Sequence, residues 1–180
     1  MTTKRICLHG PESTGKSTLA TRLAAHFGCE VVPEYGRAYC EAHGTDIGMA
    51  ELVHIAQQQD VMNRMAAGRA AELDIRQVLF DTDPLITAVW AEMMFGKRDP
   101  WFDSFSSYAD LYLLLDIDLP FVDDGLRVYA SPDQRHRFFE LCKGELDRRG
   151  VRYAIIRGQG DARFDAALRA VSTAEVGDSP

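Results

Sequence analysis

The sequence predicts a three-layer α/β fold, in which helices cover both faces of a five-stranded parallel sheet. Two observations lead to this prediction. Five short apolar runs of strand length alternate along the chain with longer stretches of helical periodicity. In addition, a glycine-rich stretch joins the first apolar run to the first helical stretch, as in a strand-to-helix turn at the edge of such a sheet.

The first strand, loop and helix occupy residues 5–27. Residues 5–9 are mostly apolar, and large apolar side chains recur every four positions at Leu19, Leu23 and Phe27, which is typical of a helix packed on a sheet. Between them, residues 10–17 have the sequence GPESTGKS, which matches the phosphate-binding pattern G-x-x-x-x-G-K-S/T. We therefore expect a nucleotide site at the N-terminus of the first helix.

Each residue type in this loop suits the binding of an anion. Gly10 and Gly15 let the backbone turn tightly and approach a phosphate, where a Cβ would obstruct. Lys16 would add a cation for the β- and γ-phosphates of ATP, the Ser17 hydroxyl would be a ligand of Mg²⁺, and Thr18 would support the helix. The ATP-binding residues expected from this stretch are Gly10, Pro11, Glu12, Ser13, Thr14, Gly15, Lys16, Ser17 and Thr18.

The second strand is expected over residues 29–33 and places two charged side chains, Glu34 and Arg37, at its carboxyl end. Ligands bind at this edge of an open α/β sheet, so both residues are candidate ligand contacts. The alternative is a local ion pair between them at the surface. A polar connection over residues 38–47 and a long helix over residues 49–73 are expected to follow.

The third strand, expected over residues 76–80, ends in Asp81-Thr82-Asp83. An apolar strand that closes on an acidic residue, downstream of a phosphate-binding loop, indicates a carboxylate that holds Mg²⁺ directly or through water, here Asp81. Asp83 would point the same way in an extended chain and serve the substrate or proton transfer. Its other role, which is compatible with the first, is the N-cap of the next helix, because Pro84 follows at a plausible first helical position.

The second half of the chain continues the alternation. A helix is expected over residues 85–95, an irregular segment over residues 97–108, and an almost continuous apolar strand over residues 109–118, which suits burial on both faces. A turn-rich segment over residues 121–127 precedes a helix that begins with Ser131 as N-cap and Pro132 at its first position. The last strand and helix are expected over residues 151–157 and 161–171. We thus predict a single domain over residues 1–172 and a flexible tail over residues 173–180.

Composition narrows the classes of function. The chain has 180 residues, 46% of them hydrophobic, and a net charge of −7, which argues against a general nucleic-acid or membrane-surface binder. The four cysteines lack C-x-x-C spacing, and the N-terminus lacks the pattern of a signal peptide, so a cytoplasmic setting is expected. The five histidines have no metal-site spacing.

Five strands that begin with a phosphate-binding loop fit a P-loop NTPase core of the kinase type, with strand order 2-3-1-4-5 and a small lid. The sequence contains no N-K-x-D motif for guanine, which argues against a small GTPase. It also lacks the second long acidic motif, the additional strands and the basic face of helicases and recombinase-like motors.

Four motifs together resemble the NadR-type ribosylnicotinamide kinase domain, a family often grouped with AAA-type ATPase domains. They are G-x-E-S-x-G-K-S at residues 10–17, E-Y-G-R at 34–37, D-T-D at 81–83 and D-D-G-L-R at 123–127. The resemblance covers residues 4–172. It implies a kinase that uses ATP and Mg²⁺ to phosphorylate the 5′-hydroxyl of nicotinamide riboside. Many of these relatives carry a fused adenylyltransferase domain and some a helix-turn-helix, and neither is present in this sequence.

The resemblance also implies roles on the acceptor side. Glu34, Asp83 or Glu12 would contact the ribose hydroxyls, and one of them, with Asp83 or Glu34 preferred, would orient or deprotonate the attacking hydroxyl. Arg37 would guide the substrate or the transferring phosphoryl group. The D-D-G-L-R segment, residues 123–127, would be a lid, with Arg127 closing over the phosphates. The remaining implied contacts are Arg135 beside the phosphates, Gln59 in an unassigned role near the substrate, and Tyr35 and Trp90 as candidates to stack on a pyridinium ring.

Two other functions stay open from the residues alone. One is a kinase for another nucleoside or small hydroxyl substrate, because the phosphate-binding loop does not specify the acceptor. The other is a non-enzymatic, nucleotide-binding regulatory ATPase, which the acidic and basic groups gathered at one sheet edge argue against.

Overall fold

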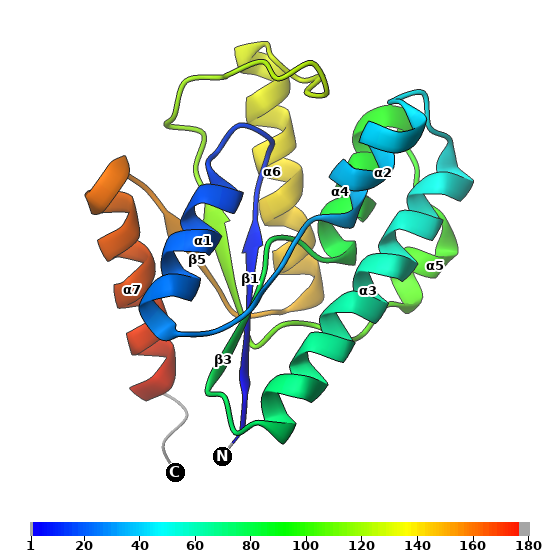
Figure 1. Ribbon diagram of the computed structural model, residues 1–180. Helices are drawn as coiled ribbons and strands as arrows, with labels where there is room; N and C mark the ends of the chain where they lie inside the picture. Colours follow the sequence, from blue (N-terminus) through cyan, green and yellow to red (C-terminus); the bar gives the residue numbers. More distant parts are fainter. Residues whose placement is uncertain (1, 177–180) are drawn as a thin grey trace.

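In the computed structural model, which describes residues 2–176, the five strands form one parallel sheet (Figure 1). The strands are β1 (Lys4–His9), β2 (Val31–Val32), β3 (Gln77–Phe80), β4 (Leu111–Leu115) and β5 (Tyr153–Ile156). Their order is β2-β3-β1-β4-β5, which confirms the predicted order. The helices are α1 (Lys16–Phe27), α2 (Tyr35–His43), α3 (Met49–Glu72), α4 (Pro84–Phe95), α5 (Pro100–Ser104), α6 (Pro132–Arg149) and α7 (Gly160–Val176).

Helices cover both faces of the sheet, as predicted. Because side chains alternate along a strand, Ile6 and Leu8 of β1 pack with α1 and α7, whereas Cys7 packs on the other face with α3, α4 and α6. Figure 1 shows α1 and α7 on one side of the sheet and α3 and α4 on the opposite side. All residues of β3 and β4 are buried, which explains why β4 and all of β3 except Gln77 consist of apolar or aromatic residues.

The carboxyl ends of the parallel strands bring distant parts of the sequence to one edge. β1 leads into the phosphate-binding loop, β2 into Glu34 and β3 into Asp81. These three strands are neighbours in the sheet, and the chain then crosses to the other side of β1 to form β4. Ligands of open α/β sheets bind at such a reversal of strand order, so the fold itself gathers the predicted site.

The prediction of a polar connection over residues 38–47 is wrong, because helix α2 begins at Tyr35 and ends at His43. None of its residues is buried, so it lacks the apolar periodicity that identifies a helix in a sequence. Side chains one turn apart support it instead: the rings of Tyr39 and His43 stack at 4.3 Å. Gly44 follows the helix and donates a backbone hydrogen bond to Cys40 O at 2.8 Å.

Two further boundaries differ from the prediction. The segment over residues 97–108 contains the short helix α5, which Asp99 caps by accepting a hydrogen bond from Trp101 N at 2.8 Å. Helix α7 continues to Val176 and therefore includes the first residues of the predicted tail. The rest of that tail, residues 177–180, lies outside the described residues. Among the helices of residues 2–176, none combines the length and the apolar character that a membrane crossing requires.

Candidate active site

The phosphate-binding loop between β1 and α1 has the backbone that its glycines predict. Gly10 and Gly15 adopt positive φ values of 128° and 81°. Lys16 folds back across the loop, and its Nζ donates to the carbonyls of Gly10 at 2.9 Å and Pro11 at 2.8 Å. The loop thus holds a cation at the N-terminus of α1, where the backbone amides and the helix dipole also favour an anion.

Gly10 is the position in this loop with the least space for a side chain. A Cβ there would lie 2.8 Å from Leu115 O of the adjacent strand β4. We expect Gly10→Ala to lower the free energy of unfolding by about 3 kcal/mol, because it adds a backbone clash to an unfavourable φ. Gly28→Ala is the control: Gly28 also has a positive φ but no atom within 4 Å, and its replacement should cost about 1 kcal/mol. Equal losses in urea denaturation would contradict the steric argument.

Arg163 of α7 contacts the phosphate-binding loop at Thr14, and no sequence pattern identifies it as a site residue. It is 4% exposed, and its guanidinium donates to the carbonyls of Thr14 and Gly158, both at 2.6 Å, and to the Asp118 carboxylate. The chain separates Arg163 from Thr14 by 149 positions, so no local pattern connects them. The one available signal was Asp118, an acidic residue at the end of the fourth predicted strand.

Ser17 and Asp81, the two predicted ligands of Mg²⁺, lie in contact with each other. Ser17 Oγ donates to Asp81 Oδ2 at 2.6 Å. The other carboxylate oxygen, Asp81 Oδ1, is buried and has no hydrogen-bond partner among the described residues. No group of three or more His, Cys, Asp or Glu side chains that could hold a metal occurs within residues 2–176. The pair fits Mg²⁺, which binds oxygen ligands and usually takes the others from phosphates and water.

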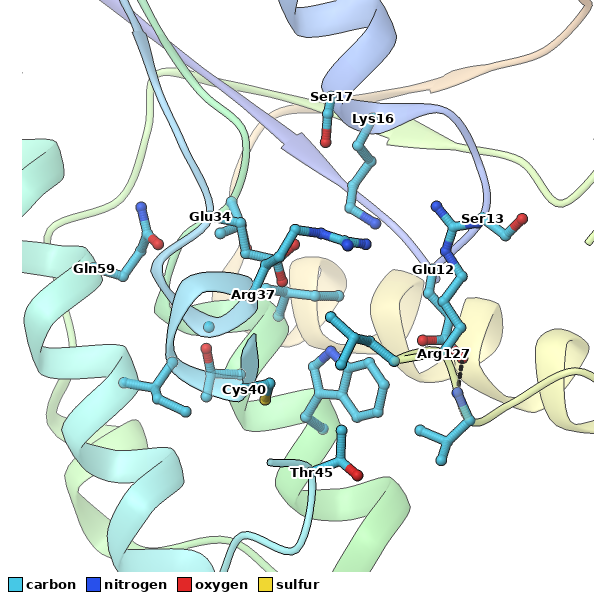
Figure 2. A pocket seen from close by; sticks show the side chains of 18 of the residues that line it. Glu12, Ser13, Lys16, Ser17, Glu34, Arg37, Cys40, Thr45, Gln59 and Arg127 are labelled. Carbon is cyan, nitrogen blue, oxygen red and sulfur yellow. Dashed lines mark hydrogen bonds between the residues drawn. The ribbon is translucent and has the colours of Figure 1, made fainter. Parts of the chain in front are cut away.

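A cavity of about 210 Å³ opens beside this loop (Figure 2). In Figure 2, Lys16 and Ser17 lie at one end of the cavity, Thr45 lies at the other, and Glu34 and Arg37 lie between them. The lining thus joins the phosphate-binding loop to the start of α2 and to the loop after it. Much of the remaining lining is apolar: Ile47, Leu52, Ile55, Ile86, Trp90, Met94 and Val128.

Glu34 and Arg37 both line the cavity, as their place at the end of β2 predicted. Burial is the main cause that raises the pKa of the Glu34 carboxyl above its usual range. Arg37 forms ion pairs with Asp124 at 2.8 Å and with Glu41 at 3.9 Å. The local ion pair with Glu34, considered as an alternative, is therefore not observed among the described residues. The Glu34 carboxylate is left facing the cavity.

Asp83, in contrast, is buried, and both of its carboxylate oxygens accept hydrogen bonds from neighbouring groups. It is 2% exposed and is not among the residues that line the cavity. Its Oδ1 accepts from Leu85 N at 3.0 Å, which makes it the N-cap of α4, and its Oδ2 accepts from the Tyr112 hydroxyl at 2.5 Å. Burial is the main cause that raises the pKa of Asp83 to about 6. The structure therefore shows the capping role that the sequence also allowed.

The raised pKa of Asp83 gives a stability prediction. Between its ordinary value of 3.8 and about 6, the folded chain binds more of this proton than the unfolded chain does, so the contribution of Asp83 to stability is lost as pH rises through this window. Asparagine can cap the helix without titrating. We therefore expect the free energy of unfolding of Asp83→Asn, measured by urea denaturation, to rise by about 3 kcal/mol relative to that of wild type between about pH 4 and pH 7. A difference that does not change with pH would contradict this assignment.

Glu12 and the lid segment lie against each other. Glu12 Oε1 accepts from the backbone amides of Val128 at 2.8 Å and Tyr129 at 2.6 Å. Burial raises the pKa of Glu12, although these two amides oppose the shift. Arg127 lines the cavity beside Glu12, donates to the carbonyl of Val122 and lies 3.3 Å from Asp124. The lid thus rests on the phosphate-binding loop.

Arg135 lies outside this cavity. Its guanidinium donates to Leu119 O at 2.9 Å and lies over the Phe121 ring at 5.9 Å. Arg135 is 9% exposed and is not among the lining residues. In this structure it holds the chain at the start of the lid.

The last three predicted contacts occupy different positions. Gln59 is buried; its Oε1 accepts from Tyr35 N at 2.7 Å and its Nε2 donates to Pro33 O at 3.2 Å, so it fixes the junction of β2 and α2. The Tyr35 ring packs near the rings of Tyr39 and His54, and Tyr35 is not among the lining residues. Trp90 lines the cavity, and its ring lies 5.3 Å from that of Tyr129.

A model of the AAA domain family matches residues 5–163. The chain belongs to this family. Curated proteins similar to the chain include the trifunctional NAD biosynthesis/regulator proteins NadR of Escherichia coli K12, at 30% identity, and Salmonella typhimurium LT2, at 29% identity. Both matches extend over 170 residues and cover 89% of this chain. The chain spans about 40% of the length of these relatives.

Comparison with solved structures also shows similarity to NadR proteins. A NadR protein in complex with NR superposes with a TM-score of 0.83 at 27% identity, over 96% of this chain and 51% of that one. A NadR protein with NAD and AMP-PNP gives 0.80 at 25% identity, over 99% and 51%. The resemblance to NadR-type kinase domains that four motifs indicated is thereby confirmed. Deoxyadenosine kinase from M. mycoides, at 9% identity and a TM-score of 0.66, shares the fold.

Proposed function

We propose that this chain is an ATP-dependent kinase that phosphorylates the 5′-hydroxyl of nicotinamide riboside and so forms nicotinamide mononucleotide for NAD salvage. The observation that carries the proposal is the cavity, which continues from the phosphate-binding loop past Glu34 and Arg37 to an apolar end. A phosphoryl donor and a small acceptor can therefore meet in one cavity. Similarity to a NadR protein solved with NR supports the choice of acceptor.

On the donor side, we infer that ATP binds the loop with Mg²⁺. Lys16 would contact the β- and γ-phosphates, while Ser17 and Asp81 would hold the metal, which neutralises phosphate charge when bound. The similar NadR structure with AMP-PNP supports a nucleoside triphosphate here. The four free cysteines suit a reducing compartment, so we place the reaction in the cytoplasm.

On the acceptor side, we assign the base to Glu34 rather than to Asp83. Glu34 lines the cavity, and burial raises the pKa of its carboxyl, which makes its carboxylate a stronger base. Both oxygens of Asp83 accept hydrogen bonds from buried partners instead. Arg37 and Arg127 would offset the charge of the transferring phosphoryl group. Trp90, which lines the cavity, would contact the cationic pyridinium ring.

A panel of acceptors tests this proposal. The purified chain is incubated with ATP and Mg²⁺ and with nicotinamide riboside, adenosine, deoxyadenosine, cytidine, uridine or thymidine, and products are identified by mass. We expect kcat/KM for nicotinamide riboside to exceed that for every other nucleoside by at least about 100-fold, because the apolar end offers few partners for the polar edges of other bases. Faster turnover of another nucleoside would refute the acceptor and retain the kinase chemistry. Hydrolysis of ATP without any phosphorylated acceptor would refute both.

A further inference from the structure

Besides the contacts of Arg135 before its start, three tethers hold the lid and the residues that flank it. At its start, Val122 N donates to Ser13 Oγ at 2.8 Å. At its end, the amides of Val128 and Tyr129 donate to Glu12 Oε1. Both of these tethers come from the phosphate-binding loop. The third comes from α2, on the acceptor side, and it runs through Asp124.

Asp124 lies between two arginines that come from different elements. Its Oδ2 accepts a hydrogen bond from Arg37 Nη2 of α2 at 2.8 Å and lies 3.3 Å from Arg127 Nε of the lid. Its Oδ1 accepts from Leu126 N at 3.2 Å and closes the local turn. The Arg37 guanidinium is the main cause that holds the pKa of Asp124 below its usual range. One carboxylate thus bridges the lid to the acceptor side.

This bridge has an electrostatic consequence. Arg37 and Arg127 both line the cavity, and two guanidinium groups at one site repel each other unless an anion lies between them. Asp124 supplies that anion before any phosphate arrives. In the proposed reaction the phosphoryl group passes between donor and acceptor beside these two arginines, so the position of Arg127 must be set to within a fraction of an ångström for it to act.

We propose that Asp124 is a positioning residue that holds Arg127 over the site of phosphoryl transfer by joining the lid to Arg37. This inference rests on the proposed kinase function. Without the bridge, the ends of the lid stay on the phosphate-binding loop through Ser13 and Glu12, but its middle loses the tether to α2. Nucleotide binding is then largely retained, whereas the alignment of Arg127 and the exclusion of water are lost.

The chain offers a matched pair of substitutions. Asp124→Asn keeps an oxygen for Leu126 N and removes the charge that binds the arginines. Asp123→Asn makes the same chemical change one position earlier, where Asp123 Oδ1 accepts from Gly125 N at 2.9 Å and from no other group within residues 2–176. We expect Asp124→Asn to lower kcat about tenfold with KM for ATP within about threefold, and to raise the amount of ADP formed per phosphorylated acceptor. Asp123→Asn should change kcat less than about twofold.

A double-mutant cycle tests whether Asp124 acts through Arg127. In an Arg127→Ala background, adding Asp124→Asn should change kcat less than about twofold, because the group it positions is gone. The same tenfold loss in both backgrounds, or equal effects of Asp124→Asn and Asp123→Asn, would overturn the inference.

Hydrogen–deuterium exchange gives a readout that needs no turnover. Peptides that span residues 120–130 should take up deuterium faster in Asp124→Asn than in Asp123→Asn, because the middle of the lid is freed. If the wild-type chain phosphorylates no acceptor, the proposed function is wrong. The exchange measurement still tests whether Asp124 joins the lid to Arg37. Equal uptake in the two variants would show that it does not.

Discussion

Replacing Lys16 by alanine is expected to lower the rate of nicotinamide riboside phosphorylation by at least about 10³-fold. The Lys16 amine is held across the phosphate-binding loop by the carbonyls of Gly10 and Pro11, at 2.9 and 2.8 Å, where it can turn to bound phosphates. Its charge would stabilise the negative charge that develops on the transferring phosphoryl group. Because it pairs with backbone carbonyls and not with a buried carboxylate, its removal should change the melting temperature by less than about 3 °C.

Steady-state kinetics and thermal denaturation measured together test this expectation. Lys143→Ala is the control, because Lys143 lies at the surface of α6, where it pairs with Asp147 and interacts with the Tyr153 hydroxyl, far along the chain from the loop. It should leave kcat within about twofold of wild type. If Lys16→Ala turned over at the wild-type rate, the assignment of the phosphate-binding loop would be wrong.

The second large effect is expected from Glu34→Gln. If Glu34 accepts the proton of the attacking hydroxyl, its amide should lower kcat by about 10² to 10³-fold and leave nucleotide affinity within a few fold. The acidic limb of the pH–rate profile should disappear in this variant, because burial raises the pKa of Glu34 and its titration would limit the wild-type rate at low pH.

Asp83→Asn is the comparison that separates the two carboxylates. Asp83 caps α4 and accepts from Tyr112, so its variant should change stability with pH and keep kcat within about fivefold of wild type. The opposite ranking of the two variants in kcat would assign the base to Asp83 and contradict the role of Glu34.

The fold could be predicted almost completely, because it depends on local patterns. The glycine-rich loop fixes where β1 ends and α1 begins, and the apolar run of β4 is long enough to identify a buried parallel strand. The strand order then follows from the phosphate-binding loop and its kinase-like context. Helix α2 was missed because its residues are not buried, so its stability comes from ring contacts such as that between Tyr39 and His43.

The candidate site could be predicted only where a residue type and a strand end coincide. Ser17, Asp81 and Glu34 lie where the sequence placed them, because each follows directly from an element boundary. Arg163 could not be found in this way, since its contact with Thr14 joins opposite ends of the chain. Whether Asp83 faces the cavity or a buried tyrosine depends on the direction of one side chain, which its spacing from Asp81 does not determine.

The most direct test of the central claim is the identity of the product formed from ATP and nicotinamide riboside. Mass spectrometry and ³¹P NMR of the reaction mixture are expected to show nicotinamide mononucleotide, with the phosphate as a monoester coupled to the 5′-methylene protons and about one ADP formed per product. Lys16→Ala measured in parallel should give no product above background. ADP without nicotinamide mononucleotide, or phosphate on another hydroxyl, would contradict the claim.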